Sequence, residues 1–221
     1  MERSPIPEES PGAIGAVILA AGSGRRIGTP KLRLESAGKS YLEIILELLG
    51  QAEVAPVAVV VAAEEKAWAC HLLAGKSGRP DRRPKPAPAL RQETTLLVNP
   101  HPEQGMLSSV QLGIAALRAC TGLFIVPVDH PFVALSTYLL LKQACGQNPG
   151  AIIKPVYNGR PGHPVVVPIA LSEAILAAEP GASLRDLLRG AGTELIRVEA
   201  GDAGILKNIN EPGDRLIITD T

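Results

Sequence analysis

Residues 16–31 read AVILAAGSGRRIGTPK, and this stretch decides the fold. Its first six residues are all aliphatic, which predicts a strand buried on both faces, as in parallel sheets. The glycine-rich loop that follows carries three cations: Arg25, Arg26 and Lys31. Small glycines let backbone N–H groups approach an anion, and guanidinium and ammonium groups match phosphate oxygens. The stretch therefore predicts a strand that ends in a polyphosphate-binding loop.

Two better-known phosphate loops do not fit these residues. The dinucleotide fingerprint G-x-G-x-x-G would need its third glycine at position 27, where the chain has Ile27. A P-loop needs Gly-Lys followed by Ser or Thr, but Gly28 is followed by Thr29 and Pro30. A plain glycine turn with solvated arginines is the remaining structural alternative. The loop is thus expected to bind phosphate in some other manner.

Aliphatic runs and helical periodicity alternate along the rest of the chain. The expected strands cover residues 54–63, 96–99, 123–128, 151–157, 164–168 and 194–198, and the expected helices cover 42–49, 64–73, 108–120, 134–145, 171–178 and 184–189. The alternation predicts one α/β domain with a doubly wound, mostly parallel sheet. We assign this domain to residues 13–221, after a disordered leader over residues 1–12. Ser183, with Asp186 three residues on, predicts a capping box at the last of these helices.

Composition excludes several classes of function. The formal net charge is zero, so no overall basic field favours nucleic acid as a partner. No apolar run reaches membrane-spanning length, and the polar N-terminal residues do not have the pattern of a signal peptide. The three cysteines, Cys70, Cys120 and Cys145, are expected to be buried thiols in a reducing compartment. We therefore expect a cytoplasmic protein that does not associate with membranes.

Three polar or glycine positions follow the ends of expected strands: Gly22, Asn99 and Asp129. Ligands of doubly wound sheets bind beyond the carboxyl ends of the strands, so these positions should converge on one crevice. A carboxylate there suits Mg²⁺, which often uses one or two carboxylates together with phosphates. From its placement alone Asp129 could equally cap a turn or a helix, and the converging glycine loop favours the metal.

Further candidates lie in the second half of the chain. Asn208 and Asn210 face the same way in an extended segment and could supply a second metal ligand, with Asp202 as an alternative; a polar turn before Pro212 is the competing reading. His163 either bonds an acceptor phosphate or stabilises a turn. His130 is not expected to be a ligand, because neighbours on a strand point to opposite faces.

A basic, proline-rich segment over residues 75–88 is expected to be a solvated loop. A flap that meets an anionic substrate is the minority alternative for this segment.

Several motifs together resemble the nucleotidyltransferase family that matures molybdenum cofactors. They are Leu19–Lys31, Asn99-Pro100 with Gly105–Ser109, Val128–Pro131, Gly159–Pro164 and Asn208–Pro212. The resemblance extends from Ala16 over nearly the whole chain and implies a Rossmann-like nucleotidyltransferase fold. Ala21 is similar to the cytidylyltransferase branch, because the guanylyltransferase branch usually has glycine at this place.

The resemblance also implies roles for individual residues. The triphosphate would be held by Leu19, Ala20, Ala21, Gly22, Ser23, Gly24, Arg25, Arg26 and Lys31, and Asn99 and Ser109 would approach the nucleoside. Arg26, Lys31 and Asp129 would be catalytic. Asp129 would bind Mg²⁺, with Asn208 or Asn210 as second ligand, and Gly162 and His163 would lie on the acceptor side.

These residues predict transfer of a nucleoside monophosphate, expected to be CMP from CTP, to the phosphate of a molybdopterin-type cofactor. Two alternatives remain open: transfer to another small phosphate, such as a sugar or polyol phosphate, and a non-catalytic nucleotide-binding module that delivers cofactor. The expected partners are a nucleoside triphosphate and a phosphorylated acceptor, and a molybdoenzyme or its chaperone is a candidate protein partner. GTP is the competing nucleotide.

Overall fold

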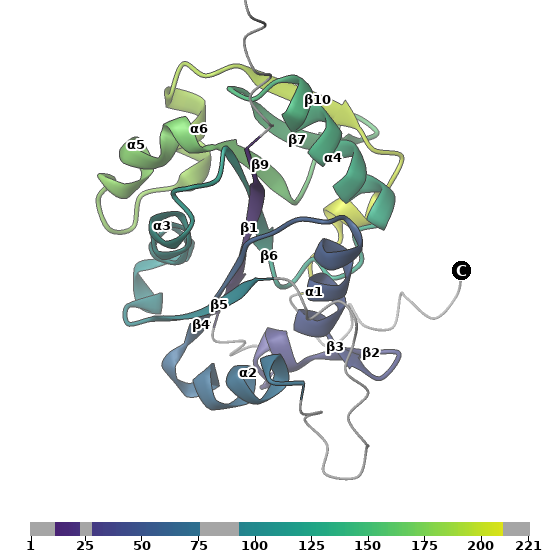
Figure 1. Ribbon diagram of the computed structural model, residues 1–221, viewed down its shortest axis with the longest axis vertical. Helices are drawn as coiled ribbons and strands as arrows, with labels where there is room; N and C mark the ends of the chain where they lie inside the picture. The colour runs from purple at the N-terminus through teal and green to yellow at the C-terminus, as the bar shows by residue number, and fades with distance from the viewer. Residues whose placement is uncertain (1–11, 23–27, 76–92, 210–221) are drawn as a thin grey trace, which may run out of the picture.

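A computed structural model describes residues 12–22, 28–75 and 93–209 of the 221-residue chain. An eight-stranded sheet runs through its centre in the order β10-β7-β9-β6-β1-β4-β5, with β8 paired to β7 (Figure 1). The strands are β1 (Ile14–Ala20), β4 (Val57–Ala62), β5 (Thr94–Asn99), β6 (Gly122–Pro127), β7 (Ile152–Tyr157), β8 (Arg160–Pro161), β9 (Val165–Pro168) and β10 (Leu195–Glu199). The predicted doubly wound, mostly parallel α/β fold is confirmed.

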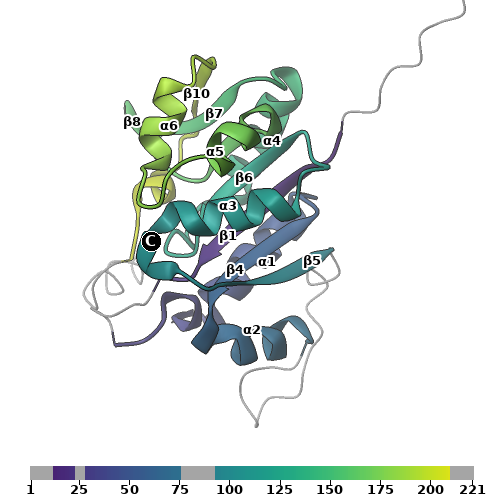
Figure 2. The ribbon, with the colours of Figure 1, turned by 90° about the vertical axis from the view of Figure 1, so that its left-hand side faces the viewer.

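Helices cover both faces of the sheet (Figures 1 and 2). They are α1 (Tyr41–Gln51), α2 (Lys66–Leu73), α3 (Met106–Ala116), α4 (Leu135–Gln147), α5 (Ser172–Leu176) and α6 (Leu184–Gly190). Because side chains alternate along a strand, β1 contributes to two cores. Ala16 and Ile18 pack on the side of α1, α2 and α4, whereas Val17 and Leu19 pack on the side of α3, α5 and α6. The strand is therefore aliphatic at every position, which is the pattern that predicted it.

The chain reverses its direction of winding beside β1. From β1 the chain moves outward to β4 and β5, and then returns to form β6 on the other side of β1. β1 and β6 are parallel neighbours, so their carboxyl ends meet at the point where the strand order reverses. Doubly wound sheets bind their ligands at such a switch point. The topology thus places the loop after β1 and the turn after β6 together.

One strand of the sheet core runs against the others. β9 is antiparallel to both β6 and β7, with Ile125 opposite Val165 and Ile153 opposite Val166. The amino end of β9 therefore lies at the same edge of the sheet as the carboxyl ends of its neighbours. Gly162 and His163, which precede β9, are brought to that edge.

Local sequence signals explain the start of α1. A small antiparallel hairpin, β2 (Glu35–Ser36) and β3 (Lys39–Ser40), turns at Ala37 and Gly38, which both have positive φ. Ser40 then caps α1 in a capping box, because its side chain accepts from the Glu43 backbone while the Glu43 carboxylate bonds the Ser40 backbone N–H.

Three smaller predictions are corrected. Ser183 precedes α6, but its side chain makes no cap hydrogen bond, so the capping box predicted there is absent from this described helix. Cys70 is exposed, and only Cys120 and Cys145 are buried as expected. The carbonyl of Gly12 accepts a hydrogen bond from Thr121 Oγ1 at 3.0 Å, so this residue belongs to the fold rather than to a leader. Residues 1–11, and all of segment 75–88 except Gly75, lie outside the described residues.

The longest described helix, α4, has 13 residues, and no helix in the described part of the chain is long and apolar enough to cross a membrane.

Candidate active site

An ion pair joins the two segments that meet at the switch point. Lys31 Nζ donates to Asp129 Oδ2 at 2.7 Å, although 98 positions separate the residues in the sequence. Both side chains are largely covered, with about a fifth of each exposed. Asp129 follows β6, and the N–H of Val128 bonds the carbonyl of Leu19 at 3.1 Å, which fixes the turn against the end of β1. The ion pair therefore brings the segment after β1 beside the end of β6.

Lys31 is held in place by the short 3-10 helix η1 (Lys31–Arg33). Leu32 is fully buried beneath it. Arg33 Nε bonds Glu65 Oε2 at 2.5 Å, and the guanidinium lies over the Trp68 ring at 5.4 Å from its centroid. Buried and stacked contacts of the two residues that follow Lys31 limit its backbone freedom, so its side chain extends toward Asp129 from a fixed backbone position.

The last described residues also reach Asp129. The Ile209 N–H donates to the Asp129 carbonyl at 3.0 Å, and the Ile209 side chain is buried. Asn208, the residue before it, is exposed. The predicted second metal ligand therefore lies on a segment that is bonded to the Asp129 backbone, while Asn210 lies outside the described residues.

Asp202 was predicted as an alternative metal ligand, but in the structure its carboxylate caps backbone N–H groups. Its Oδ2 accepts from the Ala134 N–H at 2.8 Å and from the Thr137 hydroxyl at 2.7 Å, both at the start of α4. Its Oδ1 accepts from the Gly204 N–H at 2.8 Å. These three donors tie η6 (Ala203–Leu206) to α4, so both carboxylate oxygens are engaged in holding the fold together.

Two histidines line the other side of Asp129. The rings of His130 and His163 lie 4.9 Å apart between centroids, and His130 Nε2 lies 3.9 Å from Asp129 Oδ1. Neither ring has a partner for its buried Nδ1 among the described residues. His130 follows the end of β6 in a turn, so the strand alternation that had excluded it does not apply. On the sequence alone His130 was therefore set aside, although His130 and His163 are each followed by a proline and this shared pattern could have linked them.

Both imidazoles are neutral at pH 7. Burial lowers the pKa of His130, and the neighbouring Lys31 lowers it further, against the opposing effect of Asp129. Burial also lowers the pKa of His163 to about 4, and the nearby His130 and Lys154 act in the same direction. Neutral rings with an unbonded nitrogen can give or take one hydrogen bond without adding charge to the crevice.

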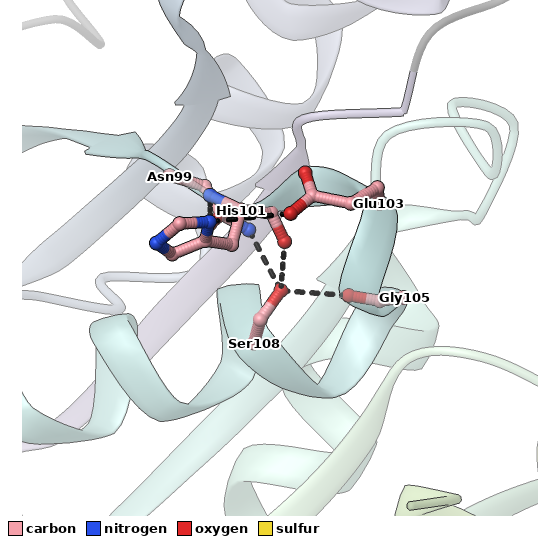
Figure 3. A network of polar contacts seen from close by, with 5 residues as sticks. All are labelled: Asn99, His101, Glu103, Gly105 and Ser108. Carbon is pink, nitrogen blue, oxygen red and sulfur yellow. Dashed lines mark hydrogen bonds and ion pairs between the residues drawn. The ribbon is translucent and has the colours of Figure 1, made fainter. Parts of the chain in front are cut away.

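Asn99 organises a loop rather than facing open space (Figure 3). The residue is 1% exposed, its Nδ2 donates to the Ser108 and Ser109 hydroxyls at 2.8 and 2.9 Å, and its Oδ1 accepts from the His101 N–H at 2.8 Å. Ser108 also donates to the carbonyl of Gly105 at 2.8 Å. These bonds brace the connection from β5 to α3. Asn99 and Ser109 therefore hold the start of α3 against the end of β5, and their contact with a nucleoside stays a prediction.

The remaining predicted site residues have mixed surroundings. Leu19, Ala20 and Ala21 are buried, so their contribution to phosphate binding would come from the backbone. Gly22 is exposed. Gly162 is packed so closely that an added Cβ would lie 2.4 Å from the carbonyl oxygen of Ile205. Packing alone therefore requires a glycine at this position, whether or not the residue contacts an acceptor. Ser23, Gly24, Arg25 and Arg26 lie outside the described residues.

The donor set around Asp129 fits a divalent cation that is shared with phosphates. No group of three or more His, Cys, Asp or Glu side chains that could hold a metal ion occurs among the described residues. Mg²⁺ commonly takes one or two carboxylates and completes its shell with phosphate oxygens and water. In the structure the Lys31 ammonium lies where it neutralises Asp129, and incoming phosphate would compete for that lysine.

A family model described as the MobA-like NTP transferase domain matches residues 16–198. The chain belongs to this family. It is also 30% identical over 127 residues to the molybdenum cofactor cytidylyltransferase of Escherichia coli (strain K12). That alignment covers 57% of this chain and 62% of the relative, so the chain matches less than two thirds of that protein.

Solved structures share the MobA-like fold over nearly the full chain. Rv0371c from Mycobacterium tuberculosis H37Rv aligns with a TM-score of 0.71 at 18% identity, over 96% of this chain and 100% of that one. The nucleotidyl transferase Mth528 from Methanothermobacter aligns with a TM-score of 0.71 at 21% identity, over 93% and 95%. At these identities the likeness shows the fold alone.

Proposed function

We propose that the protein transfers a nucleoside monophosphate, CMP from CTP, to the phosphate of a molybdopterin-type cofactor in a magnesium-dependent reaction that releases pyrophosphate. The observation that carries this proposal is the Lys31–Asp129 ion pair at the switch point, beside the end of β1. It joins a cation of the kind that binds phosphate to a carboxylate of the kind that binds Mg²⁺, in a chain of the MobA-like family, and this supports the proposal. The relative named for cytidylyltransferase activity supports the choice of base and acceptor.

The acceptor phosphate would attack the α-phosphorus of the triphosphate. A phosphate monoester has a second pKa near 6, so at neutral pH it is already an anionic nucleophile and needs no general base. The neutral state of His130 and His163 agrees with this, since their role would be to orient the acceptor through single hydrogen bonds. Lys31 would leave Asp129 for the triphosphate and offset its charge, together with Arg26 of the loop.

Mg²⁺ would be held by Asp129, with Asn208 or Asn210 as a further ligand from the segment bonded to the Asp129 backbone. When bound, it supplies positive charge that stabilises the departing pyrophosphate.

The preference for CTP rests on the similarity to a cytidylyltransferase. Ala21 is buried, so its methyl group offers little surface with which to exclude a purine. We expect CTP to be used in preference to GTP in a competition assay, and equal or better use of GTP would contradict this part of the proposal.

The test combines substrates with a matched pair of variants. Wild-type protein, each nucleoside triphosphate, Mg²⁺ and the candidate acceptors are combined and scored for pyrophosphate. Asp129→Asn should lower turnover by on the order of 100-fold or more, because it removes the charge that holds the metal. Glu173→Gln is the control. Glu173 lies on α5 and forms an exposed ion pair with Arg118, and the loss of this pair should leave turnover unchanged.

Pyrophosphate release would separate an enzyme from a nucleotide-binding delivery module. The acceptor that supports release would separate a molybdopterin-type cofactor from a sugar or polyol phosphate. Normal turnover of folded Asp129→Asn would place the metal elsewhere and refute the assignment of this residue.

A further inference from the structure

Four basic side chains converge on one face of the sheet near its β10 edge. They are Lys154 on β7, Arg197 on β10, and Arg185 and Arg189 on α6. Lys154 and Arg197 are direct partners in the parallel register of β7 and β10, so their side chains leave the same face about 5 Å apart. We call these four residues the basic cluster.

The helix α6 brings the other half of the basic cluster to this face. Ile152, two residues before Lys154, belongs to the core packed by α3, α5 and α6, which fixes the face on which Lys154 lies. Arg185 and Arg189 are four residues apart on α6 and so share one side of the helix. Arg185, Arg189 and Arg197 are exposed, while Lys154 is half-buried.

The four cations act on one another. Burial lowers the pKa of Lys154, and Arg185, Arg197 and Arg189 lower it further. Two described acids lie nearby. Asp186 Oδ1 lies 3.3 Å from Arg189 Nη1 in an exposed pair, and the Glu199 carboxylate accepts from the Asn158 N–H at 3.3 Å. Like charges held together in this way favour a bound anion, because it relieves their mutual repulsion.

The basic cluster lies near His163, the residue proposed for the acceptor side. The Gly162 N–H donates to the Pro155 carbonyl at 2.9 Å. His163 follows Gly162 and therefore lies across from the end of β7, where Lys154 directly precedes Pro155. Lys154 and Arg185 are also among the charges that lower the pKa of His163. Ile153 and Phe124 both lie opposite Val166 of β9, so Lys154 is about two strand spacings, on the order of 10 Å, from Ile125 across the sheet. Asp129 lies four residues beyond Ile125, so its separation from Lys154 exceeds about 10 Å.

We propose that the basic cluster binds a second anionic group of the acceptor, at a distance of this order from the phosphate that attacks the triphosphate. The acceptor is then a polyanion: one end is a phosphate monoester beside His163, and the other carries a further anionic group on Lys154, Arg185 and Arg197. A short sugar or polyol monophosphate cannot occupy both places. The identity of the ligand as the acceptor rests on the proposed transferase function. The presence of an anion site does not depend on that function.

The anion site can be tested without any transfer reaction. Backbone amide resonances of nucleotide-free protein are followed by NMR during a titration with inorganic phosphate. In wild type the amides around Lys154 and Arg197 should shift and saturate. In the Arg185→Gln/Arg197→Gln variant the apparent Kd should rise about tenfold or more, because two charged partners are lost. Arg118→Gln, an exposed arginine of α3's C-terminal connection, is the matched control and should behave as wild type.

A second measurement connects the site to the acceptor. With pyrophosphate release as readout, the double variant should lose about tenfold or more in kcat/KM for an acceptor with two anionic groups. The KM for the nucleotide and the kcat/KM for an acceptor with one phosphate should stay unchanged. Equal kcat/KM of wild type and variant for the dianionic acceptor would overturn the inference while leaving the transferase intact.

The two proposals can fail separately. If wild-type protein releases no pyrophosphate with any acceptor, the transferase function fails, and the phosphate titration alone decides the anion site. If phosphate shifts no amide near the basic cluster, or shifts it equally in the double variant, the anion site is refuted whatever the transfer assay gives. An unchanged melting temperature of the double variant, expected for exposed arginines, confirms that both measurements are made on folded protein.

Discussion

His163 should make the protein sensitive to acid, and a single substitution should reduce that sensitivity. Burial, reinforced by His130, Lys154 and Arg185 against Asp129, lowers its pKa from 6.5 to about 4. In the unfolded chain the ring takes up a proton below pH 6.5, whereas in the folded protein it resists protonation until pH 4. Protons therefore favour the unfolded state in this window, and stability falls as the pH drops from 6.5 to 4.

The size of the effect follows from the two pKa values. A difference of one pKa unit corresponds to 1.36 kcal/mol, so the full loss attributable to His163 is about 3 kcal/mol once the pH is below 4. Between pH 7 and pH 4.5 most of this loss, about 2 kcal/mol, has already occurred. His163→Gln keeps a polar side chain but cannot titrate, so its stability should fall less over the same range.

Urea unfolding at pH 7 and at pH 4.5 measures this difference for wild type and for His163→Gln. His71→Gln is the control, because His71 is exposed on α2. The gap in free energy of unfolding between wild type and His163→Gln should shift by about 2 kcal/mol between the two pH values, and the gap for His71→Gln should stay constant. Parallel pH profiles for wild type and both variants would refute the buried, neutral state of His163.

Three further substitutions test how the fold holds the crevice. Ser40→Ala should cost about 1 kcal/mol in urea unfolding because it removes the capping box of α1, whereas Ser183→Ala should cost little; equal costs would contradict the cap assignment. Gly113→Ala places a Cβ 2.2 Å from a Val17 methyl and should lower stability by about 1–3 kcal/mol, so an unchanged melting temperature would show that β1 and α3 are not in this contact. Asn99→Ala removes bonds from a buried amide and should cost about 2 kcal/mol while raising the nucleotide KM; a loss of stability alone would confine the residue to a structural role.

The layers of the fold could be read from the sequence because the strands are aliphatic throughout. Runs such as residues 16–21 and 123–128 have no polar face, and only strands covered by helices on both sides bury such runs. Boundaries were less accurate where backbone chemistry intervenes. A strand was predicted from Val54, but β4 begins at Val57, because Val54 still bonds the end of α1 and Pro56 has no N–H to donate to the ladder.

The direction of β9 was not predicted, although a signal existed. A parallel and an antiparallel strand of sequence VVVP look alike in hydrophobic pattern. The Asn158-Gly159 pair, which has positive φ at both residues, makes a tight turn that only antiparallel strands can use. That turn reverses the chain after β7 and determines how His163 enters the crevice.

Part of the candidate site could be predicted, and part depended on contacts between distant segments. Asp129 was expected beside the glycine loop because both follow strands that end at the switch point, and the ion pair with Lys31 came from the structure. His130 was set aside by an argument that holds only inside a strand. The basic cluster was missed because β7, α6 and β10 each contribute only one or two of its charges, and only the register of the sheet brings Lys154 and Arg197 side by side.

The reversed strand β9 has a consequence for how this architecture can diversify. In a wholly parallel sheet, every loop at the carboxyl edge is tied to a crossover helix, so changing the loop disturbs the packing of a helix. Gly162 and His163 instead reach that edge from a hairpin, and no helix lies between β7 and β9. The connection from β7 to β9 can therefore change, except at the closely packed Gly162, without repacking a helix, while the segments after β1 and β6 stay as they are. One scaffold could in this way keep its nucleotide chemistry and exchange the molecule that receives it.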